Sequence, residues 1–214
     1  MRPDGVIFDC DGVLVDSEAI AFDLLETDLA LYGLTVTRAE IEREMMGLTL
    51  AGVGDKARQL GASLPADWVE DFYEQLYAKL EQGAPLVPGV LTVLDALDAA
   101  GVPYAIGSNG SLRKMEITLG QHPGLIPRFQ GRIFSGQDLP RPKPAPDLFL
   151  KAAAALGVAP DRCIVVEDSP TGARAARAAG MRCMGYAPHG GHALEAEGAI
   201  PFPSMFDLPA RLGL

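Results

Sequence analysis

The sequence predicts an α/β fold in which a Rossmann-like parallel sheet core carries a helical cap inserted after the first strand. Short apolar runs alternate with longer segments whose apolar residues recur at helical spacing, which is typical of a parallel sheet covered by helices. One long stretch breaks this alternation, because it shows helical patterning and no convincing strand. We therefore expect a core formed by residues 1–16 and 86–214 and a cap formed by residues 17–85.

Five short apolar runs are the expected core strands, at residues 6–8, 104–106, 132–134, 163–166 and 182–186. The segments between them show helix signals. An apolar stripe over residues 90–97 closes at Gly101, and a second stripe over 149–156 closes at Gly157. A third helix is expected over 171–179, after a Ser169-Pro170 start signal and before Gly180.

The expected cap contains at least two amphipathic helices. Apolar positions assign Leu24, Leu25, Leu29 and Leu31 to the first, and a repeat every four residues assigns Trp68, Phe72, Leu76 and Leu80 to a later one. Residues 83–89 are rich in glycine and proline and form the expected return linker. A glycine-rich turn from Gly47 to Gly54 is the expected specificity loop.

Composition and charge exclude several classes of function. The 214 residues carry a formal net charge of −10, which argues against binding to nucleic acid or to an anionic membrane surface. No apolar run reaches membrane-spanning length, and the N-terminus does not have the pattern of a signal peptide. Cys10, Cys163 and Cys183 are far apart in the sequence and odd in number, so we expect buried thiols of a reduced, cytoplasmic protein. We also expect a monomer or a weak dimer.

Polar side chains gather where the predicted strands end. Asp9 and Asp11 follow the first strand, Ser108 and Asn109 the second, and Glu167 and Asp168 the fourth, while Lys143 lies in a proline-rich loop before the fourth. Ligands of open parallel sheets bind at this edge. Crowded carboxylates repel each other unless a cation lies among them, and oxygen ligands beside a phosphate favour Mg²⁺.

The motifs DxDG, Ser-Asn, Lys-Pro and Glu-Asp, in this order, resemble the four signature motifs of the haloacid dehalogenase superfamily. The resemblance covers essentially the whole chain, and the helical insertion matches that superfamily's cap between the first and second motifs. The segments FDCDGVLVDSE, SNG, RPKPAPDLF and VVEDSPTGARAARAAGM are similar to its sugar-phosphatase and β-phosphoglucomutase-like branch.

The resemblance implies the catalytic and metal-binding residues. Asp9 would be the nucleophile that forms an aspartyl-phosphate, and Asp11 would be the general acid and base. Mg²⁺ would be held by the carboxylates of Asp9 and Asp168 and by the backbone carbonyl of Asp11. Glu167 would contact a metal-bound water. The Ser108 hydroxyl, the Asn109 backbone N–H and Lys143 would bind the phosphate.

The expected activity is Mg²⁺-dependent hydrolysis of a small phosphate ester, such as a sugar or sugar-acid phosphate and possibly 6-phosphogluconate. A phosphosugar mutase is the alternative, but Ala21 and Leu50 stand where that branch carries a histidine and an arginine, which favours hydrolysis. Asp11 and Asp168 make dehalogenation unfavourable. A regulatory protein without activity would be expected to have lost one of the motif residues.

Other polar residues have two interpretations. Asp16, Ser17 and Glu18 either line the hinge of the cap or only start a helix. His189 and His192 flank two glycines, and a solvated loop is favoured over a metal site. The side chain of Cys10 should point away from the site, because strand neighbours alternate.

Overall fold

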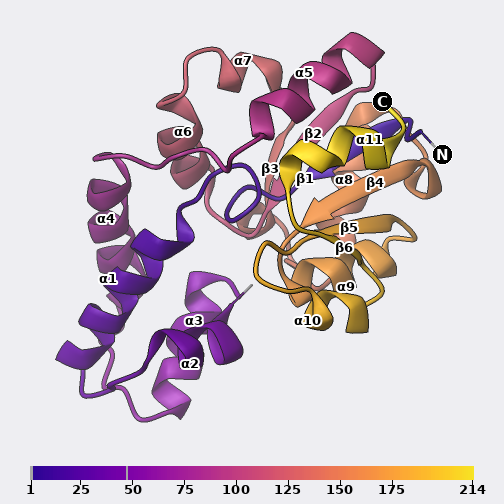
Figure 1. Cartoon of the computed structure of the whole chain (residues 1–214). Coiled ribbons are helices and arrows are strands. Elements are labelled where there is room, and N and C mark those ends of the chain that lie inside the picture. Colours follow the sequence, from indigo (N-terminus) through magenta and orange to yellow (C-terminus); the bar gives the residue numbers. More distant parts are fainter. Residues whose placement is uncertain (1, 47) are drawn as a thin grey trace.

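The computed structural model describes residues 2–46 and 48–214, and its centre is a parallel sheet with strand order β3-β2-β1-β4-β5-β6 (Figure 1). The strands are β1 (Gly5–Phe8), β2 (Tyr104–Ser108), β3 (Ile133–Ser135), β4 (Cys163–Glu167), β5 (Arg182–Tyr186) and β6 (Ile200–Phe202). The five expected strands are confirmed. The sixth was not predicted, because it is three residues long and contains Pro201, which an edge strand tolerates.

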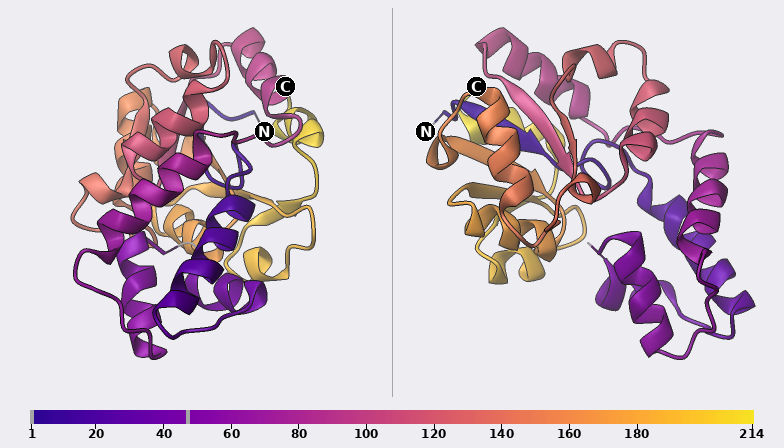
Figure 2. Two further views of the ribbon diagram at one scale, coloured as in Figure 1. Left: turned by 90° about the vertical axis from the view of Figure 1, so that its left-hand side faces the viewer. Right: turned by 180° about the vertical axis from the view of Figure 1, so that it is seen from behind.

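Helices cover both faces of the sheet (Figures 1 and 2). One face packs against α5 (Val90–Ala100), α6 (Leu112–Gly120), α7 (Leu125–Arg128) and α11 (Leu208–Leu212), and the other against α8 (Asp147–Leu156), α9 (Pro170–Ala178) and α10 (His192–Ala196). Successive strand residues point to opposite faces, so Val6 and Phe8 join one apolar cluster and Ile7 joins the other. The fold is therefore a three-layer α/β/α core.

The predicted helix boundaries of the core are confirmed. Gly101 and Gly157 follow α5 and α8 with φ of 64° and 69°, a left-handed conformation that glycine adopts without steric cost. At the start of α9, the Ser169 hydroxyl accepts a hydrogen bond from the Gly172 N–H, and Pro170 occupies the first turn.

The residues between β1 and α5 form four helices, which Figure 1 shows set apart from the sheet. They are α1 (Glu18–Leu31), α2 (Arg38–Met45), α3 (Leu50–Gln59) and α4 (Trp68–Leu80). Their shared core includes Leu29, Ile41 and Trp68, and the Trp68 indole donates to Asp28 Oδ2 at 2.6 Å. The four leucines expected in the first cap helix all lie in α1. Leu31 is 78% exposed, because it lies two residues beyond Leu29 and faces away from it.

The expected glycine-rich specificity turn is wrong over most of its length. Gly47 lies outside the described residues, and residues 50–54 form the first half of α3. Thr49 caps this helix by accepting a hydrogen bond from the Gly52 N–H at 3.2 Å. A Cβ at Gly54 would lie 3.0 Å from the Trp68 ring, so this glycine permits close packing of α3 on α4.

The chain leaves the core and returns to it along two adjacent segments. Val15 and Leu86 form an antiparallel bridge, the Asp16 N–H donates to the Pro85 carbonyl at 2.8 Å, and the Val87 N–H donates to the Leu14 carbonyl at 3.0 Å. This short ribbon links the core to α1–α4. Within the described residues, no helix has the length and apolarity needed to span a membrane.

Candidate active site

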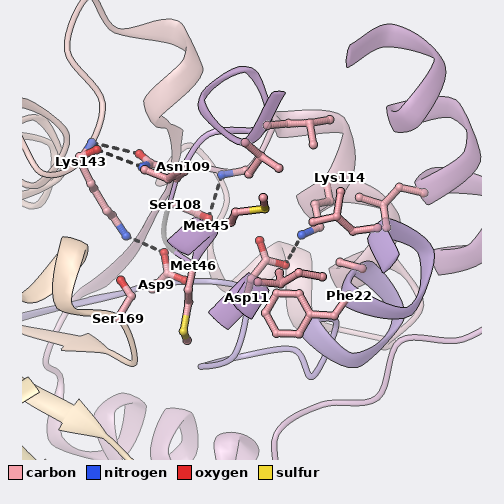
Figure 3. A pocket seen from close by; sticks show the side chains of 18 of the residues that line it. Asp9, Asp11, Phe22, Met45, Met46, Ser108, Asn109, Lys114, Lys143 and Ser169 are labelled. Carbon is pink, nitrogen blue, oxygen red and sulfur yellow. Dashed lines mark hydrogen bonds and ion pairs between the residues drawn. The ribbon is translucent and has the colours of Figure 1, made fainter. Parts of the chain in front are cut away.

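The carboxyl ends of β1, β2 and β4 meet at one edge of the sheet, where the strand order reverses around β1. A cavity of about 980 Å³, open to solvent, lies between this edge and helices α1–α4 (Figure 3). All seven predicted site residues line it. They are Asp9, Asp11, Ser108, Asn109, Lys143, Glu167 and Asp168.

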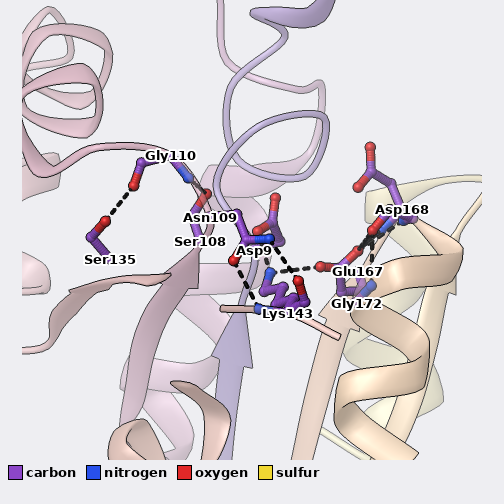
Figure 4. A network of polar contacts seen from close by, with 10 residues as sticks. Asp9, Ser108, Asn109, Gly110, Ser135, Lys143, Glu167, Asp168 and Gly172 are labelled. Atoms are coloured by element: carbon purple, nitrogen blue, oxygen red, sulfur yellow. Dashed lines mark hydrogen bonds and ion pairs between the residues drawn. The ribbon is translucent and has the colours of Figure 1, made fainter. Parts of the chain in front are cut away.

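Lys143 joins two carboxylates at the base of the cavity. Its Nζ lies 2.5 Å from Asp9 Oδ1 and 2.7 Å from Glu167 Oε1, and all three side chains are buried (Figure 4). The ammonium also lies 4.7 Å from the centre of the Phe149 ring. The proposed nucleophile is therefore fixed in one orientation by a buried cation.

Burial and neighbouring charges perturb this cluster. Burial raises the pKa of Asp9 to about 7; Lys143 opposes the shift, and the carboxylates of Glu167 and Asp11 add to it. Burial alone would lower the pKa of Lys143, but the carboxylates of Asp9 and Glu167 raise it above its ordinary value. Asp9 thus lies in a region of excess negative charge, and a bound cation would relieve it.

Glu167 is held in place by the start of α9. Its Oε2 accepts hydrogen bonds from the Asp168 N–H at 3.0 Å and from the Ser169 N–H and hydroxyl, both at 2.8 Å (Figure 4). A Cβ at Gly172 would lie 1.8 Å from Glu167 Oε1, so only glycine leaves room for this carboxylate. Both oxygens of Glu167 are engaged by protein donors, so its observed contacts position Lys143, and its predicted contact with a metal-bound water stays a prediction.

Asp11 has a cation of its own, which the sequence analysis missed. Lys114 Nζ lies 2.7 Å from Asp11 Oδ1, and the Ser17 hydroxyl donates a hydrogen bond to the same oxygen. Burial alone would raise the pKa of Asp11, but Lys114 and the Ser17 hydrogen bond hold it below its ordinary value. Lys114 lies in the first turn of α6, where a cation is unfavourable, and this misplaced charge was the available signal.

The structure settles the two interpretations of the segment after β1. Ser17 stands at the N-cap position of α1 but makes no capping hydrogen bond, because its hydroxyl serves Asp11. The Asp16 N–H belongs to the ribbon between core and cap. α1 begins at Glu18, whose side chain lies outside the described residues. The segment is thus both a hinge and a helix start.

The second motif organises the loop that carries Lys143. Asn109 Oδ1 accepts from the Lys143 N–H at 3.0 Å, and Asn109 Nδ2 donates to the Lys143 carbonyl at 3.3 Å. The buried Ser108 hydroxyl accepts from the Gly110 N–H at 3.1 Å. The Asn109 side chain therefore clamps the lysine loop, a function that sequence reasoning missed, while phosphate binding by its N–H and by Ser108 stays a prediction.

The donor set is compatible with Mg²⁺, with two side-chain ligands. The described residues contain no group of three or more His, Cys, Asp or Glu side chains arranged for a metal, and the Asp11 carboxylate is paired with Lys114. Asp9 and Asp168 both line the cavity and could supply carboxylates, with the Asp11 backbone carbonyl as a third donor. Mg²⁺ is usually held by one or two carboxylates, waters and substrate phosphate.

Other candidate residues lie away from this chemistry. His189 is exposed in a turn, as expected, whereas His192 is the first residue of α10, where it is fully exposed and pairs with Glu195 at 3.4 Å. Cys10 is fully buried in the main apolar cluster and is not among the lining residues, in agreement with its predicted orientation. Cys163 and Cys183 are also buried free thiols.

The wall opposite the carboxylates comes from α1–α4 and is apolar. Its residues are Ala21, Phe22, Leu25, Ile41, Met45, Met46, Leu48, Leu50, Val53, Phe72, Tyr73 and Leu76. The single polar group among them, the Tyr73 hydroxyl, accepts a hydrogen bond from Gln137 of the core. Tyr77 and Ser111 form a second contact between the two walls, with 2.6 Å between their hydroxyl oxygens.

Comparison with known proteins agrees with this geometry. The sequence pattern of the haloacid dehalogenase-like hydrolases matches residues 3–180. The chain is 34% identical to 6-phosphogluconate phosphatase of Escherichia coli over 182 residues, which cover 84% of this chain and 80% of the relative.

Two solved structures are similar over nearly their whole length. A conserved haloacid dehalogenase-like protein of Agrobacterium tumefaciens is 36% identical with a TM-score of 0.83, covering 98% of this chain and 97% of that one. A haloacid dehalogenase family hydrolase of Deinococcus radiodurans, solved with bound phosphate and sodium, is 36% identical with a TM-score of 0.78, covering 99% and 96%. The chain belongs to the haloacid dehalogenase-like hydrolase family and is a phosphoric monoester hydrolase.

Proposed function

We propose that the enzyme is a Mg²⁺-dependent phosphatase that hydrolyses a small phosphorylated sugar or sugar acid, such as 6-phosphogluconate, through an aspartyl-phosphate on Asp9. The observation that carries this proposal is the paired arrangement of two aspartates with two lysines at one cavity. Lys143 fixes Asp9, and Lys114 fixes Asp11. Further support for the sugar class comes from the relative named 6-phosphogluconate phosphatase.

In the first step, Asp9 attacks phosphorus and the bond from phosphorus to the ester oxygen breaks. Lys143 lies against Asp9, where its charge offsets the repulsion between a carboxylate and a phosphate. Bound Mg²⁺, held by Asp9, Asp168 and the Asp11 carbonyl, would supply further neutralisation of the phosphoryl charge. The products of this step are the aspartyl-phosphate and the leaving alcohol.

Asp11 acts as the general acid and the general base. It gives a proton to the leaving oxygen in the first step and takes one from the attacking water in the second, which releases inorganic phosphate and restores Asp9. Lys114 and Ser17 hold Asp11 as a carboxylate, the form that the second step needs. The first step needs the acid, and an anionic substrate in the cavity would raise the pKa of Asp11 by repulsion between like charges.

Hydrolysis is favoured over transfer to a second sugar hydroxyl. Ala21 and Leu50, at the positions where a mutase would carry histidine and arginine, both line the cavity. Neither side chain can hydrogen-bond a sugar or hold a second phosphate.

We also propose that residues 17–85 act as a cap over the core formed by 1–16 and 86–214. The adjacent crossings at Val15 and Leu86, and the apolar wall that α1–α4 present to the cavity, support this division. The three buried free thiols support a reducing, cytoplasmic setting. A monomer or weak dimer stays a prediction.

A phosphate-release screen tests the proposal. The purified enzyme is assayed over phosphorylated sugars, sugar acids and nucleosides, once with Mg²⁺ and once with EDTA. Release that requires Mg²⁺ is expected for a small set of compounds. Equal release in EDTA would contradict the metal assignment, and isomerisation of hexose 1-phosphates without phosphate release would contradict hydrolysis.

A further inference from the structure

The leaving-group side of the cavity is poorly suited to a substrate covered in hydroxyl groups. Phe22, Met45, Met46 and Phe72 line this side, and they offer aromatic faces and sulfur atoms in place of hydrogen-bond donors. A sugar hydroxyl pressed against such a wall loses its water and finds no partner. A flat, uncharged ring would instead make favourable contacts with aromatic rings and methionine sulfur.

The charges of the cavity also favour an uncharged leaving group. Two cations line the described part of it, and each is already balanced by carboxylates. Lys143 lies between Asp9 and Glu167, and Lys114 is paired with Asp11. A carboxylate or second phosphate on the leaving group would therefore have no unbalanced cation to meet among these residues.

The cavity is open to solvent and extends beyond the charged residues. Its lining continues from Asp9 and Asp11 to Phe22, Met45 and Phe72 of the opposite wall. In Figure 3, Phe22 lies beside Asp11, and Met45 and Met46 lie in the middle of the view, between Asp11 and Lys143. A ring attached to the sugar would lie against this wall when the phosphate is at Asp9.

We infer that the substrate is a sugar phosphate that carries a flat, uncharged ring, of the chemical class of a nucleoside 5′-monophosphate, and that this ring binds against the apolar wall of α1, α2 and α4. This inference rests on the proposed phosphatase function and its aspartyl-phosphate chemistry, but it replaces the sugar-acid example given there. Bare polyol phosphates and sugar acids, including 6-phosphogluconate, are then the poorer substrates.

Four compounds test the inference: uridine 5′-monophosphate, adenosine 5′-monophosphate, ribose 5-phosphate and 6-phosphogluconate. The ring is the main difference between the nucleotides and ribose 5-phosphate. With Mg²⁺ present, kcat/KM for at least one nucleotide should exceed that for ribose 5-phosphate by about 10- to 100-fold. The difference should appear mainly in KM if the ring contributes binding in both ground state and transition state.

A near-isosteric variant locates the effect on the wall. Met46→Gln keeps the length of a half-buried side chain but adds an amide, and it should lower the ratio of kcat/KM for the nucleotide to kcat/KM for ribose 5-phosphate by about 10-fold. Leu31→Gln is the matched control, because Leu31 is exposed on α1 outside the cavity. Thermal unfolding of each variant confirms that it is folded.

The outcomes are distinguishable. Equal or better use of ribose 5-phosphate or 6-phosphogluconate would overturn the inference and leave the phosphatase function intact. An equal loss on all substrates in Met46→Gln, with the fold intact, would also overturn the placement of the ring. Release of phosphate from none of the four compounds by folded enzyme with Mg²⁺ would overturn the inference. No Mg²⁺-dependent release from any compound of the wider screen would overturn the proposed function as well.

Discussion

The two walls of the cavity are built on opposite principles. On the core wall, Asp9, Asp11, Lys114, Lys143 and Glu167 form two charged clusters whose geometry is set by hydrogen bonds and tight turns. On the wall of α1–α4, the lining side chains are apolar, and the one hydroxyl among them is bonded to the core. On the core wall, hydrogen bonds and ion pairs fix the position of each polar side chain, whereas the wall of α1–α4 is a packed apolar surface.

This difference separates reactivity from selection. A charged cluster loses function when one atom moves, because each group depends on the next for neutralisation and orientation. An apolar surface tolerates volume-conserving changes and responds gradually. Substitutions on the core wall should therefore reduce kcat/KM strongly for every substrate. Substitutions on the opposite wall should reduce kcat/KM less, and by an amount that depends on the substrate.

The largest expected effect follows Asp9→Asn. The substitution barely changes volume and keeps the position of the side chain, but it removes the attacking carboxylate, so Mg²⁺-dependent phosphate release should fall by about 10⁴-fold or more. Release is measured on the best substrate of the screen, and thermal unfolding checks the fold. Substantial remaining turnover would remove Asp9 as the nucleophile and weaken the contrast between the walls.

Gly172→Ala tests how closely the core wall is specified. The new methyl would lie 1.8 Å from Glu167 Oε1, so the carboxylate must leave Lys143 and activity should fall by about 100-fold. Gly120→Ala is the matched control, because that helical glycine has its nearest neighbour at 3.6 Å. Similar kinetics for the two variants would contradict the role assigned to Glu167.

Lys114→Met separates the second charged cluster from the first. The Asp11 carboxylate loses its cation while both groups keep some solvent contact, so the free energy of unfolding at pH 7 should fall by about 1–3 kcal/mol. Lys79→Met is the control, since Lys79 is exposed on α4.

The pH dependence of this loss has a defined sign. The pKa of Asp11 is lowered in the folded protein, so the pair stabilises the fold above the unfolded-state pKa, near 3.8, and its contribution disappears as pH falls through the lower folded-state value. Denaturant unfolding in EDTA at pH 7 and at about pH 3.5 should therefore show the difference between wild type and Lys114→Met narrowing at low pH. A constant difference would show that Lys114 acts through packing alone.

The smallest expected effect concerns the helices of the opposite wall. Thr37 and Glu40 form a capping box at the start of α2, so Thr37→Ala should lower the free energy of unfolding by about 1 kcal/mol and leave kcat/KM unchanged. Thr27→Ala, which removes only an exposed hydrogen bond within α1, should have a smaller effect. A kinetic change in Thr37→Ala would show that the stability of α2 and the core chemistry are coupled.

Much of the fold could be predicted because the central strands are buried on both faces. Runs such as Cys163-Ile164-Val165-Val166 are continuous apolar segments bounded by turn residues, and such runs identify a parallel sheet. The edge strand β6 lacks this signal. The sequence indicates a loop at the first turns of α3 because Gly52 and Gly54 weaken a helical pattern, and the local sequence does not show that Gly54 packs on Trp68.

The site was predictable where a motif follows a strand and unpredictable where two elements meet. Asp9, Asp11, Glu167 and Asp168 line one cavity because they lie at or just after the ends of strands that converge at one sheet edge, while their roles stay predictions. Lys114 was missed because a lysine on an amphipathic helix is usually solvated, and only the approach of α6 to β1 brings it to Asp11. The apolar nature of the opposite wall likewise depends on how four helices pack, which a one-dimensional pattern does not specify.

The position of β1 in the sheet has a consequence for folding during synthesis. Val6 pairs with Tyr104 on one side and with Ile164 on the other, so the strand before Asp9 is completed by segments translated on the order of ten seconds later. In that interval α1–α4 emerge from the ribosome and can pack on one another, while the apolar strand β1 has neither of its neighbouring strands. Contacts of such long sequence separation form slowly, because the intervening loop must be closed first. Asp9 is thus among the first residues made and among the last to reach its working position.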